Sequence, residues 1–200
     1  MDILDTLIPI ALDLTAALNT GDRYQRLLAT LAKAIPYDAA ALLRLEGGVL
    51  VPVAARGLAP EALGRRYPLR EHPRLDIICK ADAPVRFPAD NALPDPFEGM
   101  LADDEDFVHH IHACLGCPLH ADGRLIGALT ADAVDPKAFD RLDQRFLTAV
   151  GALAGVQLQT AGLMDTLEHR AERQGQIASD LMADIFTRRG PQLLGDSAAM

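Results

Sequence analysis

The sequence contains no tryptophan, only three cysteines and 4% aromatic residues. Three cysteines in 200 residues do not form a disulfide framework, which excludes the small disulfide-stabilised secreted domains. An apolar run of the roughly 18 to 20 residues that a membrane-spanning helix needs is also missing, and the N-terminus lacks the basic segment of a secretory signal. We therefore expect a cytoplasmic protein that does not enter a membrane.

Positive charge is scarce as well. Nineteen basic residues against 28 acidic residues give a formal net charge of −9. This balance argues against direct binding of nucleic acid or of an anionic membrane through charge. Apolar residues make up 50% and charged residues 24% of the chain, which is typical of a globular protein. The length fits one domain, or one domain followed by a long helix.

The periodicity of apolar residues changes several times along the chain. Spacings of three and four predict helices, and alternation predicts strands. The expected helices are 2–18, a second one capped by Asp22, 59–67, 72–80 and 139–188; the expected strands are 39–45, 49–55, 85–87, 110–120 and 124–133. This order predicts an α+β fold in which helices flank an antiparallel sheet, with a long C-terminal helix.

The hairpin formed by the last two strands is the most informative segment. A two-residue loop, Asp122-Gly123, would place Asp132 and Cys114 on opposite faces. A three-residue loop beginning at Ala121 would instead set Asp132 opposite His112, with Thr130 opposite Cys114. The second arrangement also buries the apolar residues of the hairpin together, so we expect it. An imidazole, a thiol and a carboxylate then share one face of the sheet.

The same geometry bears on the motif Cys114-Leu115-Gly116-Cys117. Positions three apart on a strand point to opposite faces, which argues against a zinc knuckle or a redox pair. We expect Cys117 and Cys79 to be small buried apolar residues.

The proline-rich tract 88–106 separates the two halves of the predicted sheet. A loop of this length in a compact domain is often a lid or a binding loop. Its acidic residues could ligate a metal or form a solvated charge run: Asp95, Glu98, Asp103, Asp104, Glu105 and Asp106. Pro94 and Pro96 stiffen the chain around Asp95. Arg74 could be a surface base or could lie over the pocket.

Several segments, in order, resemble the sensor domain of the NorR family of nitric-oxide-responsive transcriptional activators. The resemblance runs from about Asp22 to Gly155 and is carried by 22–27, 72–75, 85–90, 93–96, 112–114 and 125–130. It implies a GAF domain that holds a mononuclear non-haem ferrous ion and binds nitric oxide. The metal ligands implied are Asp95, Glu98, His112, Cys114 and Asp132, with Arg74 beside the metal, either as a gating residue or as a residue that contacts a ligand. Five ligands around an octahedral ion leave about one open position.

Two positions depart from the family pattern. Glu98 stands where the family has an aspartate, and Lys80 stands where it has a second arginine. The glutamate keeps a hard oxygen ligand but changes its reach, and the lysine keeps charge without the planar donor geometry. Zinc, which also binds cysteine, histidine and carboxylate, is the alternative metal.

The last residues, 192–200, resemble the start of the AAA+ module of sigma-54-dependent activators. The expected organisation is a GAF sensor domain over 1–160, a linker helix over 161–189 and the beginning of the AAA+ module over 190–200. The fragment would regulate that ATPase and would not itself be an enzyme, since it has no P-loop. Two rivals stay open: a GAF-type free methionine sulfoxide reductase, which needs a thiol pair, and a metal-free GAF domain that binds a small molecule.

The C-terminal helix carries apolar residues beyond the point where the domain can cover them. They are Leu163, Leu167, Ile177, Leu181 and Ile185. An uncovered apolar stripe usually finds a partner, so we expect a homodimer in which two such helices pack together beside the helix 2–18. The alternative is a linker that orders only when the ATPase follows, which Gly162 and Gly175 favour.

Overall fold

The computed structural model describes residues 3–14, 20–102 and 111–189. The chain divides into two units, Met1–Ala161 and Gly162–Met200. The first unit holds an antiparallel six-stranded sheet of order β3-β2-β1-β6-β5-β4. The strands are β1 (Ala39–Glu46), β2 (Val49–Arg56), β3 (Tyr67–Pro68), β4 (Val85–Phe87), β5 (Ala113–Ala121) and β6 (Arg124–Ala133). The predicted fold class is confirmed, and β6 lies inside the sheet between β1 and β5.

The helices of the chain are α1 (Ile3–Leu14), α2 (Thr20–Leu31), α3 (Pro60–Gly64), α4 (Pro73–Lys80) and α5 (Gln144–Arg189), with a 3-10 turn, η1 (Leu69–Glu71). Pro9 lies inside α1. The helix expected over 59–67 is shorter than predicted, because Tyr67 and Pro68 pair with β2.

The long helix α5 begins five residues later than the periodicity predicts. The backbone N–H of Arg145 donates to the Asp143 side chain at 2.7 Å, as at a helix N-terminus. Phe139 precedes this cap, yet it is 3% exposed because the turns before the helix bury it. Burial of turn residues therefore extended the apolar pattern beyond the helix itself.

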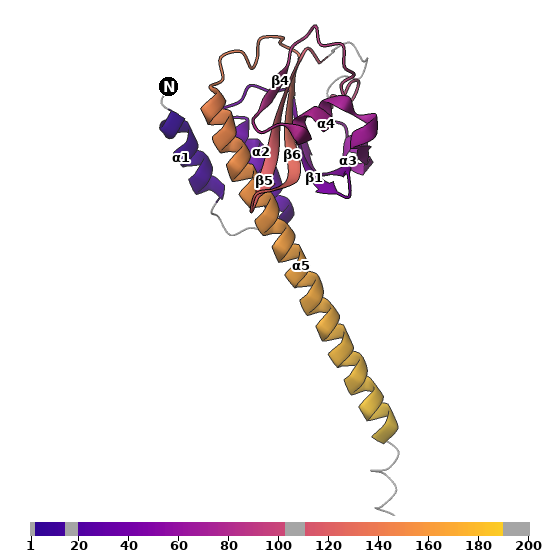
Figure 1. Ribbon diagram of the computed structural model, residues 1–200. Coiled ribbons are helices and arrows are strands. Elements are labelled where there is room, and N and C mark those ends of the chain that lie inside the picture. The colour runs from indigo at the N-terminus through magenta and orange to yellow at the C-terminus, as the bar shows by residue number, and fades with distance from the viewer. Residues whose placement is uncertain (1–2, 15–19, 103–110, 190–200) are drawn as a thin grey trace, which may run out of the picture. The chain divides into compact units, whose positions relative to one another are not determined.

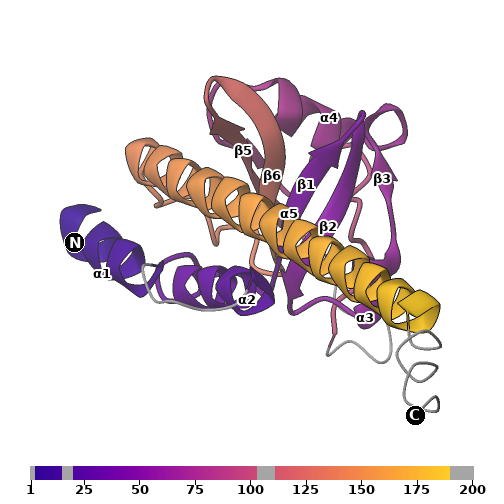
Figure 2. The same cartoon turned by 90° about the horizontal axis from the view of Figure 1, so that it is seen from below.

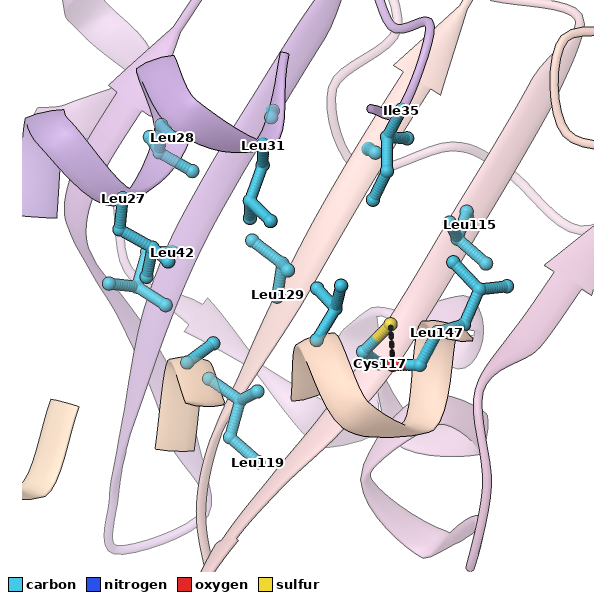
Figure 3. Close-up of a cluster of buried hydrophobic side chains, with 14 of the residues drawn as sticks. Leu27, Leu28, Leu31, Ile35, Leu42, Leu115, Cys117, Leu119, Leu129 and Leu147 are labelled. Atoms are coloured by element: carbon cyan, nitrogen blue, oxygen red, sulfur yellow. Dashed lines mark hydrogen bonds between the residues drawn. The ribbon is translucent and has the colours of Figure 1, made fainter. Parts of the chain in front are cut away.

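The sheet separates two apolar cores. One lies between the sheet and α1, α2 and the first part of α5, and includes Leu28, Leu115, Leu129 and Leu147 (Figure 3). The other lies between the sheet and α3, α4 and the 88–102 loop, and includes Leu75, Ile78, Phe97 and Cys114. Figures 1 and 2 show these helices on opposite sides of the strands. We call them the α5 core and the α4 core.

Glycines let α5 approach strand β5 closely. A Cβ added at Gly155 would lie 2.7 Å from the carbonyl oxygen of His120. Cys117, on β5, points into this α5 core and its Sγ lies 3.9 Å from the carbonyl oxygen of Leu147 (Figure 3). Cys114 belongs to the α4 core, so the prediction that the two cysteines face opposite sides is confirmed.

The β5–β6 hairpin differs from the predicted pairing. Its loop has two residues, Asp122 and Gly123, both with positive φ (50° and 71°), as in a type I′ turn. A bulge between Leu119 and His120 then shifts the pairing by one residue.

This shift decides where the polar side chains lie. Asp132 pairs with Cys114, and Thr130 pairs with Gly116. The expected pairs Asp132–His112 and Thr130–Cys114, and the three-residue loop on which they rested, were wrong. The shared face of Asp132 and Cys114 is nevertheless present, because the bulge restores it.

One described helix, α5, is long and apolar enough to pass the length and composition test for a membrane span. The segment Gln144–Ile185 contains a window of mean hydropathy 1.3, and 44% of that window is buried inside the protein. Leu147, Val150, Ala154 and Leu158 of this helix are fully or almost fully buried against the sheet. Packing in the core accounts for the apolar composition of this part of the helix.

Candidate metal centre

Three potential metal ligands meet on the α4 side of the sheet. Ligand atoms of Asp95, Cys114 and Asp132 all lie within 4.8 Å of one another. Cys114 and Asp132 are direct neighbours across β5 and β6, whereas Asp95 comes from the 88–102 loop. Two rigid strands and one loop therefore build the group.

Asp132 is the most constrained member of this group. Its side chain is fully buried, and among the described residues neither carboxyl oxygen has a hydrogen bond of good geometry. The neighbouring Cys114 thiol, a weak donor, lies close enough to lower the pKa of this carboxyl but does not replace its lost hydration. Burial raises the pKa of this carboxyl well above its usual range, and the negative charge of Asp95 adds to the effect. A carboxyl group buried without partners is costly unless something binds it.

The Cys114 thiol shares this environment. Burial raises its pKa, and the charge of Asp132 raises it further. A cation would favour the ionised forms of both groups and would supply the missing partner of Asp132. Two carboxylates and a thiolate are donors that suit ferrous iron or zinc, so the residues present fit a metal ion.

Arg74 holds the loop that carries Asp95. Its Nη1 donates to Asp95 Oδ2 at 2.6 Å, and its Nε donates to the carbonyl oxygen of Leu93 at 2.8 Å. The guanidinium carbon also lies 5.5 Å from the centre of the Phe87 ring. The side chains of Arg74 and Asp95 are 10% and 2% exposed, so this ion pair is largely shielded from solvent.

Asp95 also shapes its own loop. Its Oδ1 accepts the N–H of Phe97 at 2.8 Å, and the Phe97 ring is fully buried against Tyr67. Burial raises the pKa of Asp95, while the Phe97 N–H and the Arg74 guanidinium oppose the rise. The loop is thus ordered on the protein by its own acidic residue and by one aromatic anchor.

The other predicted ligands lie differently. Glu98 is exposed, and its charge raises the pKa of both Asp95 and Asp132, which places it near the group. His112 is exposed and directly precedes β5, and its backbone N–H donates to the carbonyl oxygen of Ala133 at 3.0 Å. Its side chain is not among the ligand atoms that meet at Asp95, Cys114 and Asp132. The acids at 103–106 lie outside the described residues.

Lys80 does not take the place of a second arginine at the centre. Its side chain is 75% exposed and pairs with Asp76 at 2.6 Å, one turn earlier in α4.

The sequence analysis did not predict two contacts of Arg74 that support the site, those with the Leu93 carbonyl oxygen and the Phe87 ring. No sequence pattern indicated these two contacts; the Asp-x-Phe segment at 95–97 indicated only the turn in which Asp95 accepts the Phe97 N–H.

A neutral replacement of Asp132 tests its electrostatic cost in the metal-free protein. Folding raises the pKa of this carboxyl above its ordinary value of 3.8. The carboxyl therefore contributes to the free energy of unfolding at pH values below 3.8, and this contribution is lost as the pH rises through the pKa of the folded state. The side chain of Asp132→Asn cannot ionise. Its free energy of unfolding should therefore equal that of the wild type near pH 4 and be larger by at least about 1 kcal/mol at higher pH.

Chemical denaturation of the metal-free variants from about pH 4 to pH 8 measures this difference. Asp90→Asn, at an exposed carboxyl, is the control and should show no such gain. A stability difference between Asp132→Asn and wild type that does not change with pH would contradict the assignment.

Three curated relatives match nearly the whole chain. The anaerobic nitric oxide reductase transcription regulator NorR of Aeromonas hydrophila subsp. hydrophila is 43% identical, over 98% of this chain and 37% of the relative. NorR of Aliivibrio fischeri is 40% identical, over 100% and 38%. The regulatory protein LuxO of Vibrio cholerae is 39% identical, over 98% and 37%. The chain therefore spans little more than a third of the length of the curated relatives it matches.

Solved structures share the fold at low identity. The GAF domain of a phosphoenolpyruvate-protein phosphotransferase from Coxiella burnetii has a TM-score of 0.67 and 22% identity, over 83% of this chain and 98% of that one. The free methionine-R-sulfoxide reductase of Neisseria meningitidis has a TM-score of 0.62 and 18% identity, over 81% and 91%. Identities this low establish the fold alone.

The family itself follows from the sequence comparison. The family model described as GAF domain matches residues 19–158, which contain the whole sheet and the candidate metal centre. The resemblance to NorR-type regulators that the motifs predict is confirmed by identities of 40% and 43% over almost the full chain. The chain belongs to the GAF domain family.

Proposed function

We propose that this chain is the sensory part of a cytoplasmic transcription regulator, and that it binds ferrous iron at Asp95, Cys114 and Asp132 and responds to nitric oxide. The observation that carries the proposal is the fully buried Asp132, whose carboxyl oxygens have no partner among the described residues although Cys114 and Asp95 lie beside them. The names of the NorR relatives support the choice of nitric oxide as the signal.

The three clustered side chains would hold the ion in two different ways. Cys114 and Asp132 stand on paired strands and supply fixed donors, whereas Asp95 comes from a loop that Arg74 restrains. Three negative donors exceed the charge of a divalent ion, and Arg74 offsets the excess. When bound, ferrous iron would supply an open position for nitric oxide, favoured by thiolate donation.

Glu98 and His112 complete the proposed ligand set. Glu98 is near enough to influence the pKa of two of the clustered groups. His112 stands two residues before Cys114, directly before the first residue of β5. Zinc fits the same donors and would be distinguished by metal analysis.

A regulatory role fits better than catalysis. A methionine sulfoxide reductase needs a reactive thiol and a second cysteine to resolve it, but Cys114 and Cys117 face different cores. Cys79 shares the α4 core with Cys114, yet burial raises the pKa of both thiols, to about 11 for Cys79, which is the reverse of what a nucleophile requires. The relatives are named as regulators.

The metal-free alternative predicts an apolar, roomy pocket. The cleft of about 650 Å³ between the segments 36–38 and 133–141 is lined in large part by charged side chains, among them Asp135, Lys137 and Arg141. It therefore does not match the apolar pocket of that alternative, and none of the three clustered residues lines it. We infer that the group of Asp95, Cys114 and Asp132 senses the signal. We also infer that the sensor regulates an AAA+ ATPase of the sigma-54-dependent type, and that another domain of the same protein would bind DNA.

Substitution of Cys114 tests the proposed centre. Cys114→Ser should lower the affinity for ferrous iron by at least about tenfold, because it removes an anionic donor. Cys117→Ser is the matched control, since Cys117 lies on the other face of the same strand. Anaerobic metal analysis and the electron paramagnetic resonance spectrum of the nitrosyl complex measure the effect. Equal iron content and equal spectra in both variants would refute the ligand assignment.

Arg74 is proposed as a gating residue, and its replacement should separate iron binding from the response to nitric oxide. Arg74→Ala should retain iron at saturating concentration while changing the nitrosyl spectrum, because the guanidinium orients Asp95 without ligating the metal. Arg70→Ala, at an exposed arginine that pairs with Glu71, is the control. Complete loss of iron in Arg74→Ala would show that Arg74 only maintains the pocket, and the gating role would then be wrong.

The proposed sensor is a homodimer. Leu163, Leu167, Ile177 and Leu181 are 59% to 63% exposed along α5, and Ile8 and Leu12 of α1 are 54% and 65% exposed. Association of two copies would remove these side chains from water.

The double variant Leu167→Glu and Leu181→Glu places charge in this apolar stripe, so it should be a monomer in sedimentation experiments. Ser179→Glu is the control on the same helix.

A second chain for the same measurement ends at Ala161, the last residue of the first unit. It should also be a monomer. A monomeric wild type would refute the dimer, and a dimer that persists in the shortened chain would place the interface in the GAF domain itself.

A further inference from the structure

Thr130 is a buried polar residue that no part of the proposed centre yet uses. Its side chain is 0% exposed, and Oγ1 has no hydrogen-bond partner among the described residues. It lies on β6 two residues before Asp132, so both side chains point to the same face of the sheet. The residue therefore faces the α4 core, next to the unpartnered carboxyl.

The space around Thr130 is shaped by small residues. Its neighbours across the sheet are Gly116 on β5 and Ala41 on β1. A Cβ at Gly116 would overlap the side chain of Ile78, so α4 packs directly on the strand at this point. Helix α4 also carries Arg74. The Thr130 hydroxyl is thus enclosed between α4 and the sheet, away from water.

Buried polar side chains gather in this region. Of the four polar or charged side chains buried in the described part of the chain, Arg74, Thr130 and Asp132 lie here, and Thr30 lies on α2. Arg74 and Asp132 are already linked to the candidate centre through Asp95 and Cys114. Thr130 is adjacent to Asp132 along the strand and diagonal to Cys114 across it. Its position joins it to the same group.

A buried hydroxyl without a partner is rare in folded proteins, because its lost hydration is not replaced. Valine has the same shape and would fill this position without that loss. The backbone groups of β6 are engaged in pairing with β1 and β5 on both sides. Asp132 is the next residue along β6 on the same face, so its carboxylate is an acceptor beside the Thr130 hydroxyl. Hydrogen bonds to a charged acceptor are the stronger kind.

We propose that Thr130 is a positioning residue of the metal centre, whose hydroxyl donates a hydrogen bond to the Asp132 carboxylate when that group binds the ion. The inference rests on the proposed metal site. The hydrogen bond occupies one carboxylate oxygen and orients the other toward Cys114 and Asp95. Partners of this kind around metal ligands commonly change affinity by about 10- to 100-fold.

Two variants separate the hydroxyl from the shape of the side chain. Thr130→Val keeps the shape and removes the hydroxyl, whereas Thr130→Ser keeps the hydroxyl and removes a methyl group. Thr148→Val, on the exposed side of α5, is the matched control. The full chain is used, with anaerobic Fe²⁺ titrated against a competing chelator and thermal unfolding measured with and without the ion.

Thr130→Val should bind Fe²⁺ about tenfold more weakly than the wild type, while its melting temperature without metal stays equal or rises. The nitrosyl complex of Thr130→Val should also give a shifted electron paramagnetic resonance spectrum. Thr130→Ser should retain wild-type affinity although it unfolds at a lower temperature without metal. Thr130→Val should therefore lose affinity without losing stability, and Thr130→Ser should lose stability without losing affinity. A threonine with only a structural role would not produce this pattern.

Three results would overturn the inference. Wild-type affinity in Thr130→Val would show that the hydroxyl does not act on the centre, while leaving the metal site itself intact. Equal loss of affinity in Thr130→Val and Thr130→Ser would assign the effect to packing. A wild-type chain that binds no Fe²⁺ would refute the proposed function, and the role of Thr130 with it.

Discussion

The burial of one carboxyl group, that of Asp132, is the constraint around which the rest of the site is arranged. It stands on β6, inside the sheet, where no solvent reaches it. An isolated charge in such a place is very costly. The neighbours across the sheet, Ala39 and Cys114, are small, so they leave room beside the carboxyl, and Asp95 arrives there with Arg74 as its counter-charge. The arrangement is costly when empty and suited to a cation.

Strand alternation predicted the most important part of this site and missed its register. The rule that alternate residues share a face correctly separated Cys114 from Cys117 and correctly grouped Cys114 with Asp132. The loop was wrong, because Asp122-Gly123 forms a two-residue turn. The irregularity at Leu119/His120 then leaves Ile126 of β6 as an extra residue, which returns Asp132 and Cys114 to one face. Such a bulge depends on how the sheet packs, which local sequence does not reveal.

The loop 88–102 shows where sequence reasoning reaches its limit. Pro94 and Pro96 indicated a stiff chain around Asp95, and the structure holds that residue in a defined turn. The partner that fixes it, Arg74, lies 21 positions earlier, and no periodicity relates the two. The position of His112, exposed just before the start of β5, depends in the same way on tertiary packing. Residue types and faces followed from local pattern, whereas the meeting of Arg74, Asp95 and Asp132 was predicted only through the family resemblance.

The two cores lie on opposite faces of the sheet, so an event at the candidate centre can reach α5 through the strands or around the edge of the sheet. Strand β4 offers the edge route. Phe87 pairs with Cys114 and lies under Arg74, while Arg86, its neighbour, donates to the carbonyl oxygen of Leu142 just before α5. Gln144, the first residue of α5, donates back to the carbonyl oxygen of Pro84. Two hydrogen bonds therefore connect the strand beside the candidate centre with the start of the long helix, and a shift of β4 would act on both of them.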